Sequence, residues 1–230
     1  MIIVMVVDLY DQLNNGTCIT AYRFAHMLRS RGHEVRVIST GGDEPDKYTV
    51  PERYWPIATP VAHMQGFVFA AADKKLFRKV FEGADVVHFL LPLHFEWVGL
   101  KIAREMGIPC SAAFHLQPEN ITYNINMGKS RTLSRWIYRF FLSTFYKKFD
   151  HIHCPTKFTA DQLKKNGYQA KLHVISNGVD VDFVPPKERK AAADGLFRIL
   201  MVGRLSPEKR QNVLIEAVRL SKYSDQERQI

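Results

Sequence analysis

The sequence predicts an α/β fold in which helices cover both faces of a parallel β-sheet. Short apolar runs alternate along the chain with segments whose apolar residues recur at helical spacing. The first run, residues 2–8 (IIVMVVD), is continuously apolar, as expected for a strand that is buried on both faces. Such an alternation of strands and helices requires right-handed crossovers, and these connect parallel strands.

The remaining elements of the first domain follow in order. Further strands are expected at residues 34–40, 85–89, 109–115, 150–155 and 171–176. Helices are expected at residues 17–32, 68–82, 95–106, 131–149 and 156–166. Residues 41–66 are rich in Pro and Gly and are expected to form a long loop. Together these elements predict one Rossmann-like domain over residues 1–180.

A second, incomplete α/β domain is expected after a linker. Residues 181–195 contain two prolines, a cationic run and a run of small residues, which is typical of a linker. A buried strand at 196–204 and a helix at 206–220, capped by Ser206, are expected next. One strand and one helix cannot bury their own apolar faces. We therefore expect residues 196–230 to begin a truncated domain, and the chain to be the amino-terminal part of a longer protein.

The composition is that of a globular protein with an acidic partner. The 230 residues are 46% hydrophobic and 24% charged, with a formal net charge of +9. Such a charge favours nucleic acid, an anionic membrane or a phosphorylated small molecule. The three cysteines form no CxxC pair, which indicates a reducing cytoplasm. No stretch reaches the roughly 18 apolar residues that a membrane-spanning helix needs, and the apolar start lacks the cationic region of a signal peptide.

Three cations gather where the last expected strand meets the last expected helix. Residues 202–210 (VGRLSPEKR) contain Arg204, Lys209 and Arg210. A cation at a helix N-terminus is disfavoured by about 0.3–1 kcal/mol, but a bound phosphate would reverse that effect. The alternative is a solvated, charged helix start, and the residues alone leave both interpretations open.

This corner carries a resemblance to a known family. Residues 202–218 (VGRLSPEKRQNVLIEAV), together with residues 173–180 (HVISNGVD), resemble family 4 glycosyltransferases of the GT-B fold. The resemblance implies that Arg204 and Lys209 hold the diphosphate of a nucleotide-sugar donor, a UDP- or GDP-sugar. Many members have Gly after this lysine, whereas this chain has Arg210. The family's acidic donor-site residues would lie beyond residue 230, so we expect no transfer activity from this chain alone.

Candidate contacts in the first domain follow from the position of its loops, because ligands of open α/β sheets bind beyond the carboxyl ends of the strands. In the loop at 8–17, Gly16 would let the backbone approach the donor diphosphate, and Asn15 is a candidate acceptor or sugar contact. The family usually has two glycines here, and a plain turn is an equal alternative. Thr17 is expected to cap the following helix.

Later loops add three candidates. His115 follows the strand CSAAF, and the resemblance implies a catalytic histidine here that contacts the transferred sugar. His94 and Glu119 are candidate acceptor or sugar contacts, the alternatives being a packed histidine (as for His88) and a solvated carboxylate. The HIHC run at 151–154 places alternate residues on opposite faces of a strand, so no metal site is predicted.

A basic aromatic segment at 129–148 suggests a membrane-surface helix. It contains six cations and no acid, and its aromatic residues recur at helical spacing. One interpretation is a core-packed helix with a cationic solvent face, and the other is an interfacial helix on an anionic bilayer, attracted by about 1 kcal/mol per Lys or Arg. The candidate membrane residues are Arg131, Arg135, Trp136, Arg139, Lys147 and Lys148. The segment before it resembles family members that glycosylate lipids such as diacylglycerol.

The resemblance thus implies a retaining, metal-independent glycosyltransferase, and no cofactor is expected. It would transfer a sugar from a nucleotide sugar to a lipid or glycan acceptor, in the cytoplasm and peripherally on the inner face of the membrane. The alternatives are a nucleotide-sugar epimerase on the same scaffold and a non-catalytic, basic membrane-surface module. No nucleic-acid partner is expected because the cations are scattered. The first turn lacks the GxGxxG of a nicotinamide dehydrogenase.

Overall fold

The computed structural model describes residues 1–12, 15–124, 127, 130–179, 198–203, 205 and 209–221. The chain divides into two compact units. The first unit comprises residues 1–118 and 130–178, and the second comprises residues 119–129 and 179–230. The linker expected at 181–195 lies outside the described residues.

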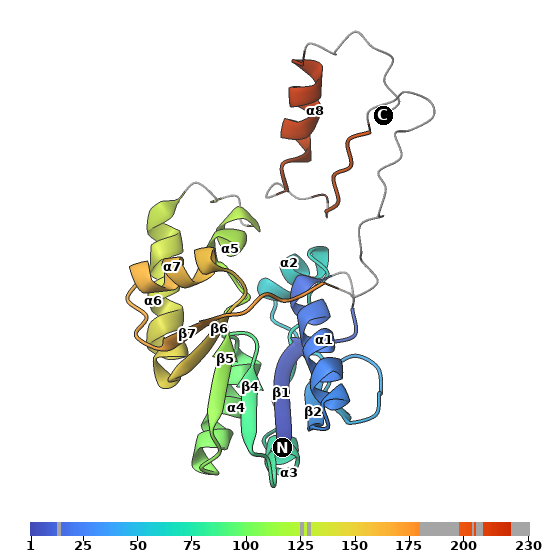
Figure 1. Cartoon of the computed structure of the whole chain (residues 1–230), viewed down its shortest axis with the longest axis vertical. Helices are drawn as coiled ribbons and strands as arrows, with labels where there is room; N and C mark the ends of the chain where they lie inside the picture. The colour runs from blue at the N-terminus through green and yellow to red at the C-terminus, as the bar shows by residue number, and fades with distance from the viewer. Residues whose placement is uncertain are drawn as a thin grey trace. The chain divides into compact units, whose positions relative to one another are not determined.

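A seven-stranded sheet forms the centre of the first unit, in the order β3-β2-β1-β4-β5-β6-β7 (Figure 1). Its strands are β1 (Ile2–Leu9), β2 (Glu34–Thr40), β3 (Lys47–Thr49), β4 (Val86–Phe89), β5 (Cys110–Ala113), β6 (His151–Cys154) and β7 (Lys171–Val174). All six ladders between these strands are parallel. The strand order reverses between β1 and β4, and such a switch point is where ligands of α/β sheets bind. The predicted fold class is confirmed.

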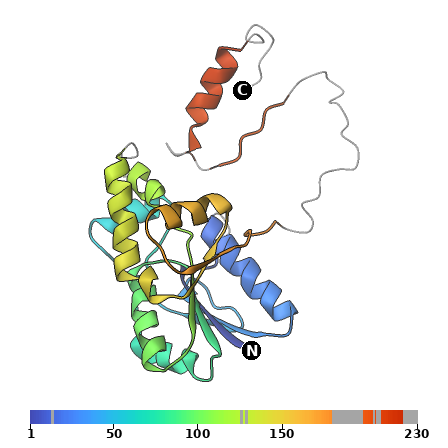
Figure 2. The same cartoon turned by 60° about the vertical axis from the view of Figure 1, so that its left-hand side comes forward.

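Helices cover both faces of this sheet (Figures 1 and 2). They are α1 (Gly16–Ser30), α2 (Ala58–Met64), α3 (Lys74–Phe81), α4 (His94–Glu105), α6 (Arg131–Thr144), the short 3-10 helix η1 (Tyr146–Lys148) and α7 (Lys157–Lys165). On one face, Met5 of β1 packs in a core with Ala21 and Ala25 of α1. On the other face, α4 lies so close that a Cβ atom at Gly99 would be 3.1 Å from the rings of Phe77 and Phe89.

Three short elements of the structure were not expected from the sequence. The expected loop at 41–66 contains β3 and α2. β3 is only three residues long and depends on pairing with Val37–Ser39 of β2, a long-range contact that local sequence does not reveal. A further helix that was not expected, α5 (Pro118–Asn124), starts at a proline. Proline suits the first turn of a helix because its missing N–H has no partner there.

The second unit contains most of α5 and the helix α8 (Gln211–Arg219). α8 begins five residues later than expected, and Ser206, the predicted cap, lies outside the described residues. Residues 198–203 form no strand, contrary to the expectation for 196–204. Val213 and Ile215 of α8 are 52% and 61% exposed. The described part of this unit therefore leaves apolar side chains of α8 uncovered, as expected for a helix without a sheet to pack on.

Candidate functional site

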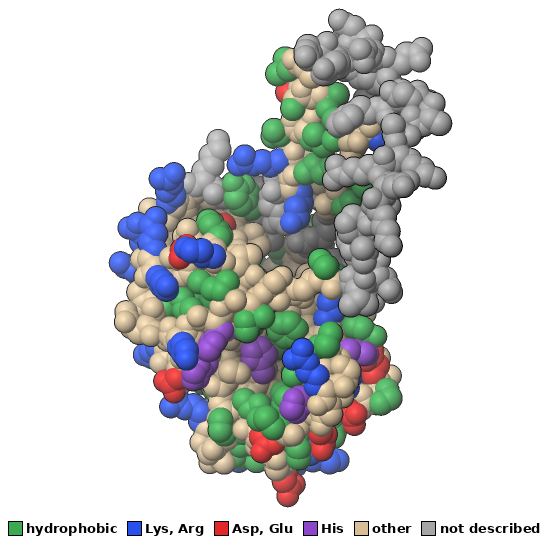
Figure 3. Space-filling view, in the orientation of Figure 1, with side chains coloured by type: hydrophobic (Ala, Val, Ile, Leu, Met, Phe, Trp, Pro, Cys, Tyr) green, Lys and Arg blue, Asp and Glu red, His purple; other side chains and the backbone are tan. Residues whose placement is uncertain are grey.

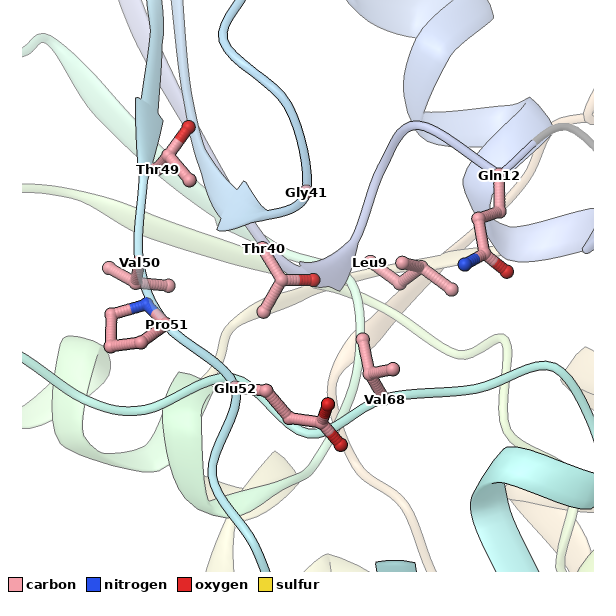
Figure 4. Close-up of a pocket in the computed structure, with 9 residues that line it drawn as sticks. All are labelled: Leu9, Gln12, Thr40, Gly41, Thr49, Val50, Pro51, Glu52 and Val68. Carbon is pink, nitrogen blue, oxygen red and sulfur yellow. The ribbon is translucent and has the colours of Figure 1, made fainter.

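A pocket of about 410 Å³ opens at the carboxyl ends of β1, β2 and β3 (Figure 4). One wall comes from the ends of β1 and β2, where Leu9 pairs with Thr40. The other comes from the segments around Glu52 and Ala70, which are joined by an isolated antiparallel β-bridge. The lining residues are Leu9, Gln12, Thr40, Gly41, Thr49, Val50, Pro51, Glu52 and Val68. An apolar floor with a few amide, hydroxyl and carboxylate groups is typical of a site for a small organic ligand.

A buried ion pair holds the loops beside this pocket. Lys47 Nζ lies 2.7 Å from Asp11 Oδ2, and the Lys47 side chain is 1% exposed. The same carboxylate oxygen accepts a hydrogen bond of 2.6 Å from the Gly42 amide. Gly41 has a φ of 101°, and a Cβ atom there would lie 1.9 Å from Asp11 Oδ2. Only glycine therefore fits at position 41, and the loops after β1 and β2 are fixed to β3.

Most polar groups that line the pocket already have partners. Thr40 Oγ1 donates to the Asp8 carbonyl at 2.6 Å, Thr49 Oγ1 donates to Asp43 Oδ1 at 3.0 Å, and Glu52 Oε1 lies 2.5 Å from His63 Nε2. Within the described part of the chain, Gln12 is exposed and its amide makes no hydrogen bond. Figure 4 shows it across the pocket from Thr49, so its amide remains available to a ligand.

Three histidines from neighbouring strands form a cluster at β4, β5 and β6. His88 Nδ1 lies 2.9 Å from Ser111 Oγ, the rings of His115 and His153 are 5.5 Å apart, and His153 Nε2 donates to the Ile175 carbonyl at 2.7 Å. Each ring keeps one nitrogen without a hydrogen-bond partner among the described residues: His88 Nε2, His115 Nε2 and His153 Nδ1.

Burial keeps these histidines uncharged. Burial, together with a smaller effect of the neighbouring histidines, lowers the pKa of His88 to about 4 and that of His115 to about 3. A neutral imidazole carries no charge for a phosphate, but its free nitrogen can form one hydrogen bond. His115 is therefore suited to form a hydrogen bond with a neutral group such as a hydroxyl.

A buried carboxyl pair at the same edge was not predicted from the sequence. Asp8, on β1, is 1% exposed, and Glu96, in the first turn of α4, is 0% exposed. Burial raises the pKa of both carboxyl groups, and the charge of Asp8 raises the pKa of Glu96 further. Asp8 Oδ1 also accepts a hydrogen bond of 2.8 Å from the Ala70 amide. Both carboxyl groups therefore favour their protonated forms more than a solvent-exposed acid does. Asp8 ends the first apolar run, which was the one sequence signal for it.

Asn15 and Gly16 begin α1. Asn15 Oδ1 accepts a hydrogen bond of 3.0 Å from the Thr17 amide, so Asn15 is the N-cap, and the expectation that Thr17 caps the helix was wrong. A Cβ atom at Gly16 would meet nothing within 4 Å. The fold itself therefore does not require glycine at this position.

His94 lies apart from the histidine cluster. It is exposed at the start of α4, and its ring lies 5.9 Å from the ring of Trp55. Burial and the charge of Arg53 lower its pKa. Within the described ranges, no ring contact or hydrogen bond joins His94 to His115.

The two cations predicted to hold the donor diphosphate, Arg204 and Lys209, belong to the second unit, and the structure describes only one of them. Arg204 lies outside the described residues. Lys209 precedes α8 instead of lying in its first turn, and its Cγ is 3.4 Å from the position of a Cβ atom at Gly203. Arg210 has a φ of 53°, and its Nη2 donates to the Tyr123 hydroxyl at 3.4 Å. Glu119, the other candidate of this unit, lies in the first turn of α5.

The basic aromatic helix α6 divides its aromatic residues between the core and solvent. Ile137, Tyr138 and Phe141 are buried, whereas Trp136 and Phe140 are 61% and 46% exposed and stack with their ring centroids 5.5 Å apart. Arg131, Arg135, Arg139 and Lys147 are also exposed. Lys and Arg side chains gather on the part of the face in Figure 3 where α6 and α7 lie.

The described residues contain neither a membrane-spanning helix nor a cluster of metal ligands. None of the helices in this part of the chain is both long and apolar enough to cross a bilayer. No group of three or more His, Cys, Asp or Glu residues with a geometry suited to a metal ion occurs in the same part of the chain.

Comparison with known proteins places the chain in a family. The model of Glycosyltransferase Family 4 matches residues 14–183, well over half of the chain. The alpha-monoglucosyldiacylglycerol synthase of Streptococcus pneumoniae is 23% identical over 235 aligned positions, which cover 95% of this chain and 52% of the relative. The GDP-mannose-dependent alpha-mannosyltransferase of Mycolicibacterium smegmatis is 27% identical over 219 positions, which cover 85% and 54%.

A solved glycosyltransferase from Rickettsia africae has a TM-score of 0.46 and 16% identity, covering 79% of this chain and 44% of that chain. The chain spans about half the length of the curated relatives that it matches. The family match covers most of the sheet and the predicted site residues of the first unit. The chain belongs to glycosyltransferase family 4.

Proposed function

We propose that the protein is a retaining, metal-independent glycosyltransferase that transfers a hexose from a UDP- or GDP-sugar to a lipid or glycan acceptor. The match of residues 14–183 to family 4 is the observation that carries this proposal. The names of the two relatives support the substrate classes, since one makes a glucosylated diacylglycerol and the other depends on GDP-mannose. In this proposal residues 1–180 form the acceptor-side domain and residues 196–230 begin the donor domain.

The predicted residues have distinct roles in this reaction. His115 contacts the transferred sugar through its free Nε2, as a neutral group. Arg204 and Lys209 hold the donor diphosphate and stabilise the negative charge that grows on it as it leaves, which is where fixed cations help most. Gly16 leaves open space for the diphosphate at the start of α1. The pocket beside Gln12 and Thr49 receives the acceptor, with Asn15, His94 and Glu119 as further candidate contacts.

Transfer is tested with the full-length protein, radiolabelled UDP-glucose or GDP-mannose, and diacylglycerol in mixed micelles. We expect a labelled glycolipid that requires both donor and acceptor, keeps the anomeric configuration of the donor and forms equally well in EDTA. Conversion of the donor to an epimer without an acceptor would identify an epimerase and contradict the proposal.

We further propose that α6 binds an anionic membrane surface and makes the protein peripheral at the cytoplasmic face. Trp136 and Phe140 are stacked and exposed beside Arg131, Arg135 and Arg139, so an apolar edge and cations lie on one helix. Aromatic residues and arginines in this arrangement are typical of interfacial helices. Lys147 and Lys148, which follow this helix, would add to the attraction.

Vesicle co-sedimentation tests the membrane proposal. The W136A/F140A variant should lose most of its binding to phosphatidylglycerol vesicles, because it removes the apolar edge and keeps every cation. Binding of the wild-type protein should fall as salt rises, because exposed charges are screened. A V213A/I215A variant on α8 removes a similar apolar area elsewhere and serves as the control. Equal binding by W136A/F140A and wild type would contradict the proposal.

A further inference from the structure

A second pocket, of about 500 Å³, lies between α4 and η1. It is lined by Trp97, Leu100, Lys101, Arg104, Glu105 and Lys148. α4 starts at His94, beyond the carboxyl end of β4, and Arg104 is ten residues further along, or about 15 Å along the helix axis. β5 and β6 begin soon after α4 and η1 end, so the pocket lies toward the amino edge of the sheet. It is separate from the candidate transfer site.

The charge of this pocket is not balanced. Three of its six lining residues are cations and one is an acid. The acid, Glu105, is already paired with Arg78 through a contact of its Oε2 with Nη2. Within the described residues, Lys101 and Arg104 form no ion pair. The pocket thus presents positive charge that the protein does not neutralise.

Lys148 adds a partly sheltered cation above an aromatic wall. Its Nζ lies 5.4 Å from the centroid of the Trp97 ring, and the Trp97 side chain is 41% exposed. Burial lowers the pKa of Lys148, and the charges of Arg104 and Lys147 lower it further. An anion bound between these groups would relieve this repulsion and gain charge-assisted hydrogen bonds.

We propose that this pocket binds the phosphate group of a phosphate-bearing ligand. Arg104, Lys101 and Lys148 supply N–H donors for the phosphate oxygens. Trp97 and the buried Leu100 supply an apolar wall for the carbon skeleton next to the phosphate. A phosphate of this kind has two sources, a soluble phosphorylated molecule or the headgroup of an anionic phospholipid, and both use the same contacts.

The test uses Trp97 as a reporter. The chain has three tryptophans, and replacing the exposed Trp55 and Trp136 by Phe leaves Trp97 as the sole indole fluorophore. The W55F/W136F protein is titrated with inorganic phosphate, with pyrophosphate, and with vesicles of phosphatidylglycerol or of phosphatidylcholine. A saturable change in fluorescence with phosphate or pyrophosphate assigns a soluble ligand. A change with phosphatidylglycerol vesicles alone assigns a lipid headgroup.

Charge variants in the W55F/W136F background show whether the probe that changes the Trp97 fluorescence binds in this pocket. The K101Q/R104Q variant should raise the dissociation constant from the titration about tenfold or more, because it removes two charge-assisted contacts. K164Q/K165Q removes two exposed cations at the end of α7 and should leave the response within about twofold. Circular dichroism melting checks that each variant is folded. The proposal is overturned if no probe gives a saturable response, if both charge variants weaken it equally, or if phosphatidylcholine gives the same response as phosphatidylglycerol.

Discussion

Three acids near the carboxyl edge lie in two different surroundings. Asp11 is matched by the buried ammonium of Lys47 at 2.7 Å, which stabilises its charge. Asp8 and Glu96 face each other in the core, and burial favours their protonated forms. The Asp8–Glu96 pair should therefore contribute to how the stability of this domain depends on pH. This pair provides the clearest test of how burial affects the pH dependence of unfolding, because both carboxyl groups are fully buried.

Replacing Glu96 by Gln should flatten the pH dependence of unfolding. The native pKa of Glu96 lies above its unfolded value, so between these values the native state holds more protons than the unfolded state. The free energy of unfolding therefore falls as pH rises, by up to about 1.4 kcal/mol per pH unit and proton. In E96Q this loss should shrink, and the variant should be more stable than wild type at pH 8. Urea unfolding between pH 4 and 8 measures both effects.

The exposed Glu105, on the same helix, provides the control. Its ion pair with Arg78 lies at the surface, so E105Q should change stability by no more than about 1 kcal/mol at any pH. Parallel profiles of unfolding free energy for E96Q and wild type would show that the buried pair does not hold a proton.

At the scale of elements, the start of α8 explains a departure from the family pattern. Many members have Gly after the lysine of this motif, and this chain has Arg210. The backbone at Arg210 is left-handed, with a φ of 53°, a conformation that glycine adopts without strain. The same backbone explains why the helix begins at Gln211, because a left-handed residue cannot lie inside a right-handed helix.

Replacing Arg210 by Gly should therefore stabilise the start of α8. A left-handed conformation costs a residue other than glycine about 1–2 kcal/mol, and R210G removes that cost at the loss of one weak hydrogen bond to Tyr123. Amide hydrogen exchange in residues 213–216 should become slower. R219G, at the far end of the helix, should make it faster because glycine is a poor helix former. Faster exchange in R210G would contradict the strain argument.

At the scale of the whole molecule, most of the fold could be predicted from the sequence. Strands of a parallel sheet are buried on both faces, so β1 appears as an uninterrupted apolar run. β3 could not be predicted, because its three residues are held by pairing with β2 and not by their own pattern. α5 was missed because Pro118 signals both a chain break and a helix start.

The candidate site was predictable only where a residue follows a strand directly. His115 comes just after β5, so the sequence alone places it at the carboxyl edge. Asp8 and Glu96 are far apart in sequence, and they meet because β4 lies beside β1 and leads into α4. His88 and His153 join His115 for the same reason, through the neighbouring strands β4 and β6. Contacts of this kind depend on the order of the strands in the sheet, which cannot be predicted from any local sequence motif.

The central claim is that this carboxyl edge transfers a sugar, with His115 in contact with it. The most direct measurement is kcat/KM for transfer by the full-length H115A variant, with H33A as the matched histidine control. We predict that H115A loses about tenfold or more in kcat/KM, the equivalent of one hydrogen bond in the transition state. H33A should stay within about twofold of wild type. Full activity of a folded H115A enzyme would contradict the account.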